Sequence, residues 1–142
     1  MSTYLFDTNA FSIFISNNIP EKWQRYWKEV RFTKRRLILF ESLISEVFYK
    51  NSEQYGFKAM KDKIGWIKTF PSSRIVKITN DDAIRAGEYM VTLRRYGLSL
   101  VDSYILALGN KYNAKIITTD PGIKQAGKKL KIKIDYIPFE KV

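Results

Sequence analysis

The sequence predicts an α/β fold in which three layers, α/β/α, enclose a central parallel sheet of four to five strands. Short apolar runs alternate along the chain with segments whose apolar residues recur at helical spacing. The short runs are apolar throughout, which is typical of strands buried on both faces, as in a parallel sheet covered by helices. With 142 residues, no internal repeat and no linker, residues 1–142 are expected to form a single domain.

In the first half of the chain, the expected strands are the apolar runs 4–6 and 37–40. Polar residues that can start a helix follow each run: Asp7 after the first, and Ser42, a suitable N-cap, after the second. Helical spacing then predicts three helices, marked by Phe11, Phe14 and Ile15, by Trp23, Tyr26 and Trp27 after Pro20, and by Leu43, Val47 and Phe48. A fourth helix is expected over residues 54–70, with Pro71 as its stop.

The second half of the chain continues the alternation. The run 75–78 is the third expected strand, and Asn80 can cap a helix that continues to about residue 95 and ends at Gly97. Ser99 can cap a helix over residues 100–112, and strand 115–118 follows. Asp120 and Pro121 start a helix in the preferred order of cap and then proline. A last strand is expected over residues 134–137, before Pro138.

Composition restricts the chemistry that is available. The chain has no cysteine and no histidine. Disulfides, thiolate catalysis, serine–histidine triads and nearly all catalytic zinc sites are therefore excluded. An enzyme with this composition depends on carboxylates, lysines, tyrosines and a bound metal.

The charge balance points to a polyanionic partner. Twenty-five Lys and Arg against fourteen Asp and Glu give a formal net charge of +11. Such a field favours nucleic acid or an anionic membrane surface, although a solvated lysine-rich surface would also explain it. No apolar run approaches the roughly 18 residues needed to span a bilayer, and the first residues do not read as a secretion signal. We therefore expect a cytoplasmic protein.

Four acidic residues occupy equivalent places on different elements. Asp7 directly follows the first expected strand, and Asp120 follows the fourth. Glu46 lies about one turn into the helix after the second strand, and Asp102 lies in the first turn of its helix. In open α/β sheets, ligands bind beyond the carboxyl ends of the strands, where the strand order reverses. We therefore expect these four side chains to line one site.

Each acid also has a purely structural explanation. Asp7 and Asp120 could cap helices, which is the common role of Asp at such junctions. Asp102 near a helix N-terminus would gain about 0.3–1 kcal/mol from the helix dipole, although its apolar neighbours predict partial burial. Glu46 has other acids nearby in the sequence that would serve equally well on a surface. The case for function depends on all four meeting.

Converging carboxylates need a cation. Two unit charges about 5 Å apart at an effective dielectric of about 20 repel by about 3 kcal/mol. Oxygen ligands without histidine or cysteine select hard ions, Mg²⁺ or Mn²⁺. Such an ion can lower the pKa of bound water and offset charge on a phosphate oxygen. An acidic centre in a basic protein therefore suits phosphodiester hydrolysis.

Four segments carry a family resemblance: residues 5–10 (LFDTNA), 45–47 (SEV), 98–107 (LSLVDSYILA) and 116–120 (IITTD). In order and spacing they resemble the PIN-domain family, especially its VapC-type toxin ribonucleases. The resemblance implies a metal-dependent endoribonuclease, the toxin of a toxin–antitoxin pair, that cuts RNA. It implies Mg²⁺ or Mn²⁺ held directly or through water by Asp7, Glu46, Asp102 and Asp120, with Thr8, Asn9 and Thr118 as supporting polar residues. It also implies a homodimer and an antitoxin that covers the active site.

One departure from the family bears on the metal. Many relatives carry a further acid shortly after the position of Asp120, whereas here residues 121–123 are Pro-Gly-Ile. We therefore expect one firmly held ion. By position alone, the candidate RNA contacts are Arg94, Arg95, Lys124 and Lys128.

Two other functions fit parts of the sequence. A PIN module with little or no catalysis, binding nucleic acid or a protein partner, is kept open by the missing fifth acid. A receiver-like phosphoacceptor domain would also use acids and Mg²⁺, but its adjacent acid pair and its lysine after the last strand are not evident. The aromatic residues Trp23, Tyr26 and Trp27 could stack on bases, but their helical spacing favours core or dimer packing.

Overall fold

A five-stranded parallel sheet forms the centre of the protein in the computed structural model, which describes residues 2–16 and 19–138. The strand order is β3-β2-β1-β4-β5, so that the first strand lies in the middle. The strands are β1 (Thr3–Phe6), β2 (Arg36–Leu39), β3 (Ser73–Ile75), β4 (Lys115–Thr118) and β5 (Ile134–Tyr136). The three-layer α/β/α fold with a parallel sheet is confirmed.

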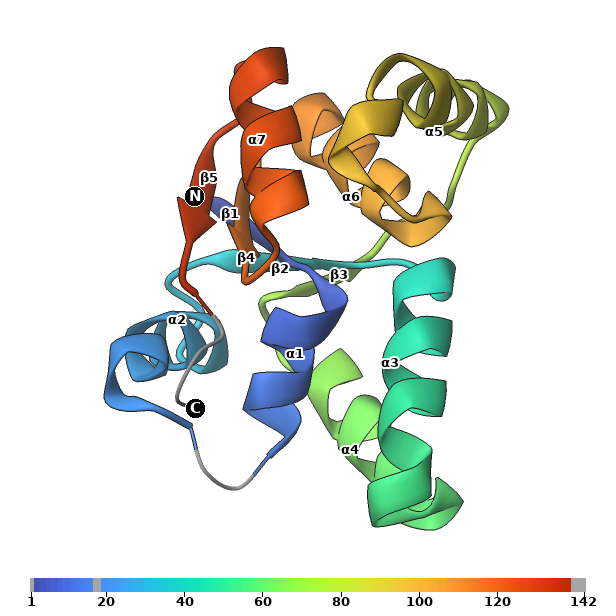
Figure 1. Ribbon diagram of the computed structural model, residues 1–142. Coiled ribbons are helices and arrows are strands. Elements are labelled where there is room, and N and C mark those ends of the chain that lie inside the picture. The colour runs from blue at the N-terminus through green and yellow to red at the C-terminus, as the bar shows by residue number, and fades with distance from the viewer. Residues whose placement is uncertain (1, 17–18, 139–142) are drawn as a thin grey trace.

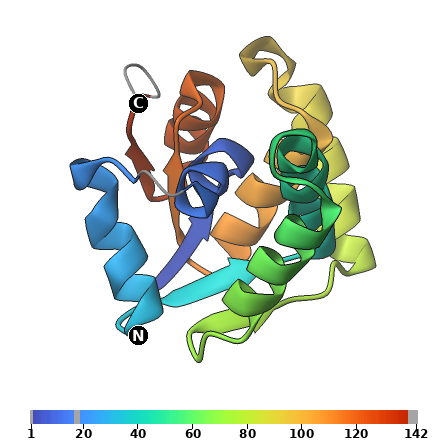
Figure 2. The same ribbon diagram turned by 90° about the horizontal axis from the view of Figure 1, so that it is seen from below.

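Helices cover both faces of this sheet (Figure 1). One face carries α1 (Thr8–Ile15), α2 (Glu21–Arg31), α3 (Glu41–Tyr55) and α4 (Phe57–Lys68). The other carries α5 (Asn80–Thr92), the 3₁₀ helix η1 (Arg94–Tyr96), α6 (Leu100–Lys111) and α7 (Pro121–Leu130). Right-handed crossovers explain the division, because the chain first moves outward from β1 through β2 to β3 and then returns to β4 and β5. The view from below in Figure 2 shows the same two groups of helices on either side of the strands.

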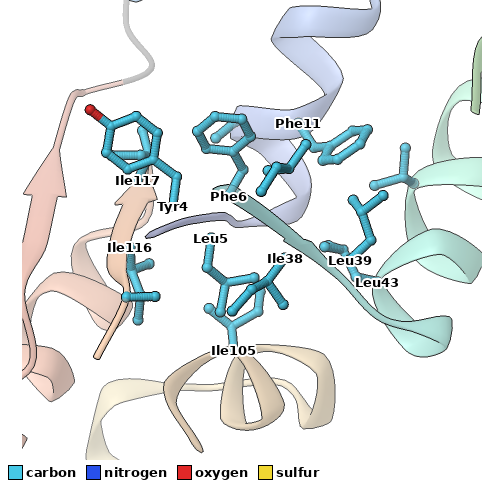
Figure 3. Close-up of a cluster of buried hydrophobic side chains, with 14 of the residues drawn as sticks. Tyr4, Leu5, Phe6, Phe11, Ile38, Leu39, Leu43, Ile105, Ile116 and Ile117 are labelled. Carbon is cyan, nitrogen blue, oxygen red and sulfur yellow. The ribbon is translucent and has the colours of Figure 1, made fainter. Parts of the chain in front are cut away.

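Apolar side chains on both faces of the strands form the core (Figure 3). Leu5, Ile38 and Ile116 point towards Ile105 of α6, whereas Phe6 points to the opposite face, where α1 lies. This arrangement explains why the inner residues of β1, β2 and β4 are apolar on both faces.

The aromatic residues of α2 belong to this core. Trp23, Tyr26 and Trp27 are all buried, and Phe14 of α1 stacks on Trp27 with ring centroids 5.2 Å apart. Core packing, and not base stacking, is therefore the role that their positions fit. Within residues 2–16 and 19–138, no helix is long and apolar enough to cross a bilayer.

The predicted third strand is displaced. The apolar run 75–78 was the expected strand, but β3 covers Ser73–Ile75 and pairs with Leu37, Ile38 and Leu39. Only one further hydrogen bond follows, from the amide of Val76 to the carbonyl of Leu39. The reason lies in β2, which ends at Leu39 and leaves residues 77–78 with no strand to pair with.

Several predicted helix ends are also wrong. Phe40, not Ser42, occupies the cap position of α3. Thr79, not Asn80, caps α5, because its side chain and that of Asp82 form a reciprocal capping box. The helix expected from 54 to 70 begins only at Phe57, since the preceding residue is glycine with φ of +86°.

The helix expected to reach residue 95 stops earlier. α5 ends at Thr92 and is followed by the separate 3₁₀ turn η1, which ends at Gly97 as predicted. Gly97 adopts the left-handed conformation with φ of +68°, which glycine tolerates without steric cost.

Candidate active site

The four predicted acids line one pocket of about 270 Å³. Asp7 lies between β1 and α1, and Asp120 lies between β4 and α7. Glu46 belongs to α3, and Asp102 belongs to the first turn of α6. β1 and β4 are neighbours at the point where the strand order reverses, so their carboxyl ends bring Asp7 and Asp120 to the same edge of the sheet.

Asp7 is the most deeply placed of the four, with only 3% of its surface exposed. Its Oδ1 accepts a hydrogen bond from the amide of Ala10 at 2.8 Å, and its Oδ2 accepts from the hydroxyl of Thr118 and from the amide of Thr119. Burial raises the pKa of Asp7 to about 6, and the charge of Asp102 adds to the rise, while the three hydrogen bonds oppose it. The carboxyl group is thus rigidly held but costly to ionise without a cation.

Asp102 forms a capping box with Ser99. Its Oδ2 accepts from the Ser99 amide at 2.9 Å, and its own amide donates to the Ser99 hydroxyl at 3.1 Å. Burial raises the pKa of Asp102, the hydrogen bonds with Ser99 lower it, and the charges of Asp120 and Glu46 raise it further. The predicted partial burial is confirmed, and the carboxylates are close enough to affect one another.

Asp120 and Glu46 complete the wall of the pocket. Asp120 caps α7 by accepting from the Gly122 amide at 2.7 Å, while its own amide donates to the Thr118 hydroxyl at 2.9 Å. Thr118 therefore links Asp7 with Asp120. Glu46 accepts a hydrogen bond from the hydroxyl of Thr8, and its Oε1 lies 3.6 Å from the Nζ of Lys50.

The structural and functional explanations of these acids hold together. Asp7, Asp102 and Asp120 all cap or brace helix starts, as the structural explanation required. In the described part of the chain, however, Oδ1 of Asp102, Oδ2 of Asp120 and Oε2 of Glu46 accept no hydrogen bond and make no ion pair. Capping therefore leaves carboxylate oxygens available to a ligand.

The donor set fits a hard cation that keeps part of its water shell. Among residues 2–16 and 19–138, no three acids are close enough as they stand to share one ion directly. Mg²⁺ commonly keeps several waters and is held by only one or two carboxylates. Free carboxylate oxygens around a small pocket, with the hydroxyl-bearing residue Thr8 and the amide-bearing residue Asn9 in its lining, match that mode of binding.

Three residues that line the pocket were not predicted to do so: Tyr49, Lys50 and Ser99, of which Ser99 was predicted only as a helix cap. Lys50 is the informative one, because it brings a positive charge to an acidic pocket. The signal for it was present, since Glu46 and Lys50 have the i,i+4 spacing of helical ion pairs.

The predicted RNA contacts lie outside this pocket. Arg94 and Arg95 belong to η1, and both are exposed. Lys124 and Lys128 lie on α7 and line a different hollow, of about 420 Å³, in which the Nζ of Lys124 is 4.7 Å from the ring centroid of Tyr136. The structure does not bring these four residues together with the acids.

Solved structures with a similar fold include VapBC2 from Rickettsia felis bound to a promoter DNA fragment (TM-score 0.72, 16% identity, 95% of this chain and 98% of that one). VapC20 from Mycobacterium tuberculosis, described as a sarcin-ricin loop cleaving toxin, has a TM-score of 0.73 at 17% identity over 87% of this chain and 95% of that one. FitAcB from Neisseria gonorrhoeae has a TM-score of 0.68 at 16% identity over 96% and 99% of the two chains.

At these identities the likeness establishes the fold. No match was found among curated proteins. The family model described as PIN domain matches residues 4–129, a span that contains all four acids of the pocket. The chain therefore belongs to the PIN-domain family.

Proposed function

We propose that this protein is a metal-dependent endoribonuclease that hydrolyses RNA phosphodiester bonds. One observation carries the proposal: four carboxylates from four separate elements line a single pocket in a strongly basic protein. With four of the fourteen acids in the pocket, ten remain elsewhere against twenty-five Lys and Arg. A basic surface attracts a polynucleotide, while an acidic centre attracts the cation that phosphodiester hydrolysis needs.

Mg²⁺ or Mn²⁺ bound at this pocket supplies charge stabilisation for the phosphate and lowers the pKa of a water nucleophile. The free oxygens of Glu46, Asp102 and Asp120 would hold the ion directly or through water, with Asp7 as the buried fourth acid. Thr118 donates to Asp7 and accepts from the amide of Asp120, so it keeps both carboxyl groups in place. Thr8 does the same for Glu46.

Lys50 has a separate role in this proposal. Its ammonium group is partly exposed at the pocket and lies 3.6 Å from Glu46. It offsets the charge of Glu46, and with a cation at Glu46 it would be available to contact a phosphate oxygen of the RNA. A lysine that exchanges partners in this way positions the strand without donating a proton.

The deciding experiment is RNA cleavage by the purified protein in Mg²⁺, Mn²⁺ or EDTA. Wild type should cut only with metal, and Asp102→Asn should abolish cutting under all conditions. Asp81→Asn is the matched control, because Asp81 is an exposed acid in the first turn of α5, away from the pocket lining. Equal cleavage by the Asp102 variant would reject the assignment.

The same pocket would belong to the toxin of a toxin–antitoxin pair acting in the cytoplasm. The structural neighbours are VapBC and FitAcB assemblies, which supports an antitoxin partner. Acidic residues on such a partner would complement the basic surface. Expression of the chain alone should arrest growth, and the Asp102→Asn variant should be tolerated.

We also propose a homodimer, supported by apolar residues left exposed on α5. Ile84 and Val91 lie about two turns apart on one face of α5 and are 64% and 63% exposed. Sedimentation of the wild type should give a dimer, and Ile84→Glu with Val91→Glu should give a monomer. Identical sedimentation of the two would place the interface elsewhere.

A PIN module with little catalysis is the second candidate. Two observations favour it: no three acids of residues 2–16 and 19–138 share a ligating geometry as they stand, and Pro121 follows Asp120 where a further acid is expected. RNA binding without metal-dependent cleavage in the experiment above would select this alternative.

A further inference from the structure

A hollow lies at the amino ends of the strands, at the opposite end of the sheet from the acids. It has a volume of about 1000 Å³. Arg36 starts β2 and Lys115 starts β4, and these strands flank β1 on its two sides. Lys133 directly precedes β5, and its carbonyl accepts a hydrogen bond from the amide of Ile116. Two strands on either side of β1 and the residue before β5 thus each contribute a cation to one hollow, which we call the basic hollow.

The described residues that line the basic hollow include five Lys and Arg but only one acid. Its one acid, Glu29, already lies 3.4 Å from Arg25 and 3.1 Å from Arg35 and accepts the hydroxyl of Tyr4. Arg36, Lys115 and Lys133 make no ion pair within residues 2–16 and 19–138. Three like charges around one concave surface repel one another and are stabilised by an external anion.

The shape and the remaining lining suit a strand of nucleic acid. The basic hollow is open, and its lining includes the aromatic residue Tyr112, which is 37% exposed, and Asn113. A positive groove with an accessible aromatic side chain is the arrangement that binds single-stranded nucleic acid through its phosphates and bases. An acidic peptide would use the charge but would leave the exposed ring and the amide without a matching group.

The basic hollow also adjoins a second basic surface that leads towards the acids. Ile132 and Ile134, the neighbours of Lys133, line the hollow that holds Lys124 and Lys128 on α7. The N-terminal end of α7 is capped by Asp120, a residue of the acidic pocket. Lys133 before β5 and Lys128 and Lys124 on α7 therefore lead from the amino ends of the strands towards the carboxyl ends, where the acids lie.

We propose that the basic hollow is a second RNA-binding site, which holds a part of the substrate distant from the cleaved bond. The inference takes the identity of the polyanion from the proposed function, but its test needs no cleavage. RNA that reaches both sites must be longer than RNA that fills the acidic pocket alone. The basic hollow thus selects long or folded RNA over short fragments.

The test measures RNA binding in EDTA on an Asp102→Asn background, so that cleavage does not interfere. The binding probe is a labelled unstructured RNA of about 30 nucleotides, above the roughly 4–16 nucleotides that one single-stranded site occupies, and an RNA of about 6 nucleotides serves as the short cleavage substrate. The variant carries Arg36→Gln, Lys115→Gln and Lys133→Gln. A matched control carries Lys58→Gln, Lys61→Gln and Lys77→Gln, three exposed lysines outside the basic hollow.

For the long RNA, loss of three phosphate contacts should lower the slope of log affinity against log salt by about 2, at about 0.7 for each contact. The control should retain most of the parent's slope. An unchanged slope for the long RNA, or an equal loss in the control, would overturn the proposal. So would a variant that loses binding of labelled polyglutamate but not of RNA, since that result would assign the basic hollow to an acidic protein.

Two further measurements keep the result interpretable. If the triple variant melts below its parent, the single change Lys133→Gln at an exposed position replaces it, with an expected slope change of about 0.7. Cleavage of the short RNA by the otherwise wild-type triple variant tests the acidic pocket separately. Loss of long-RNA binding in a protein that never cleaves would support the basic hollow and reject the proposed nuclease.

Discussion

Three acids of the pocket each serve the fold and the candidate chemistry with the same side chain. Asp7, Asp102 and Asp120 all satisfy amide groups at helix starts. Burial raises the pKa of Asp102, and the charges of Asp120 and Glu46 add to the rise. A carboxylate can do both because it has two oxygens and about four acceptor positions. Replacing one by asparagine therefore keeps an acceptor for the cap while it removes the charge.

Because asparagine keeps the acceptor and removes the charge, Asp102→Asn separates the structural role of Asp102 from its role in binding metal. Without metal, Asp102→Asn should melt no lower than wild type, because the amide oxygen can still accept from Ser99 and the repulsion with Asp120 and Glu46 is gone. Excess Mg²⁺ should raise the wild-type melting temperature and leave that of the variant nearly unchanged. Thermal denaturation in EDTA and in Mg²⁺ measures both. A clear loss of stability in EDTA would make Asp102 a structural residue only.

Asp7 should make the metal-free protein less stable as pH rises. Its pKa is about 6 in the folded state against 3.8 for an unperturbed Asp, so the folded protein binds this proton more tightly than the unfolded chain does. Its contribution to stability is complete below pH 4 and is lost as pH rises through 6, on the order of 3 kcal/mol. Unfolding free energies in EDTA between pH 4 and pH 7 should fall for wild type more steeply than for Asp7→Asn. Parallel curves for the two proteins would show that Asp7 does not titrate in this range.

At the scale of elements, the start of α7 is fixed by close packing against η1. A Cβ at Gly122 would lie 2.5 Å from the carbonyl oxygen of Tyr96 and 3.1 Å from Oδ1 of Asp120. This carbonyl is part of the backbone of η1, so a clash with it cannot be relieved by rotating a side chain. The absence of a side chain at Gly122 therefore lets the start of α7 pack closely against η1, and this packing fixes the position of Asp120.

Gly122→Ala should lower stability by about 1–3 kcal/mol, the usual cost of overpacking, and should impair metal binding by displacing Asp120. Gly87→Ala is the matched control, because a Cβ there meets nothing within 4 Å in the middle of α5. That change should stabilise the protein by up to about 1 kcal/mol through helix propensity. Denaturant unfolding and Mn²⁺ titration of both variants provide the check, and similar behaviour of the two would disprove the packing argument.

The sequence was informative about elements wherever one strong pattern decided them. Uniformly apolar runs identified β1, β2 and β4, and the positions of Asp7 and Asp120 followed directly from the ends of β1 and β4. The errors came from tertiary partners that a local pattern does not contain. The extent of β3 depends on where β2 ends, and Lys50 joins the pocket because α3 turns one of its faces towards α1. Pairing and orientation of this kind are set by distant segments.

At the scale of the whole molecule, positive charge surrounds a negative centre. Twenty-five basic residues and a small acidic pocket mean that RNA is attracted to the surface and repelled at the site of the proposed chemistry. The cation removes that repulsion. Metal and RNA should therefore bind with positive coupling.

The coupling can be measured without any cleavage. In EDTA, Asp102→Asn should bind RNA at least as tightly as wild type, because one repelling charge is gone. Ca²⁺, a hard cation with the same ligand preference, should tighten binding by wild type more than by the variant. Fluorescence anisotropy with labelled RNA gives both affinities. Weaker binding by the variant in EDTA would mean that Asp102 contacts the RNA itself.

The place of β1 in the sheet has a consequence for translation. Of the five strands, the central strand β1 leaves the ribosome before the others, and its neighbour β4 follows more than a hundred residues later, with Thr118 at its end and Asp120 after it. More than a hundred residues must therefore be synthesised after Asp7 before Thr118, whose hydroxyl donates to its carboxylate, is present. A nascent chain, or one cut short by a stop codon anywhere before residue 115, lacks this part of the pocket. Translation must therefore pass Asp120 before such a nuclease could act on the RNA around it.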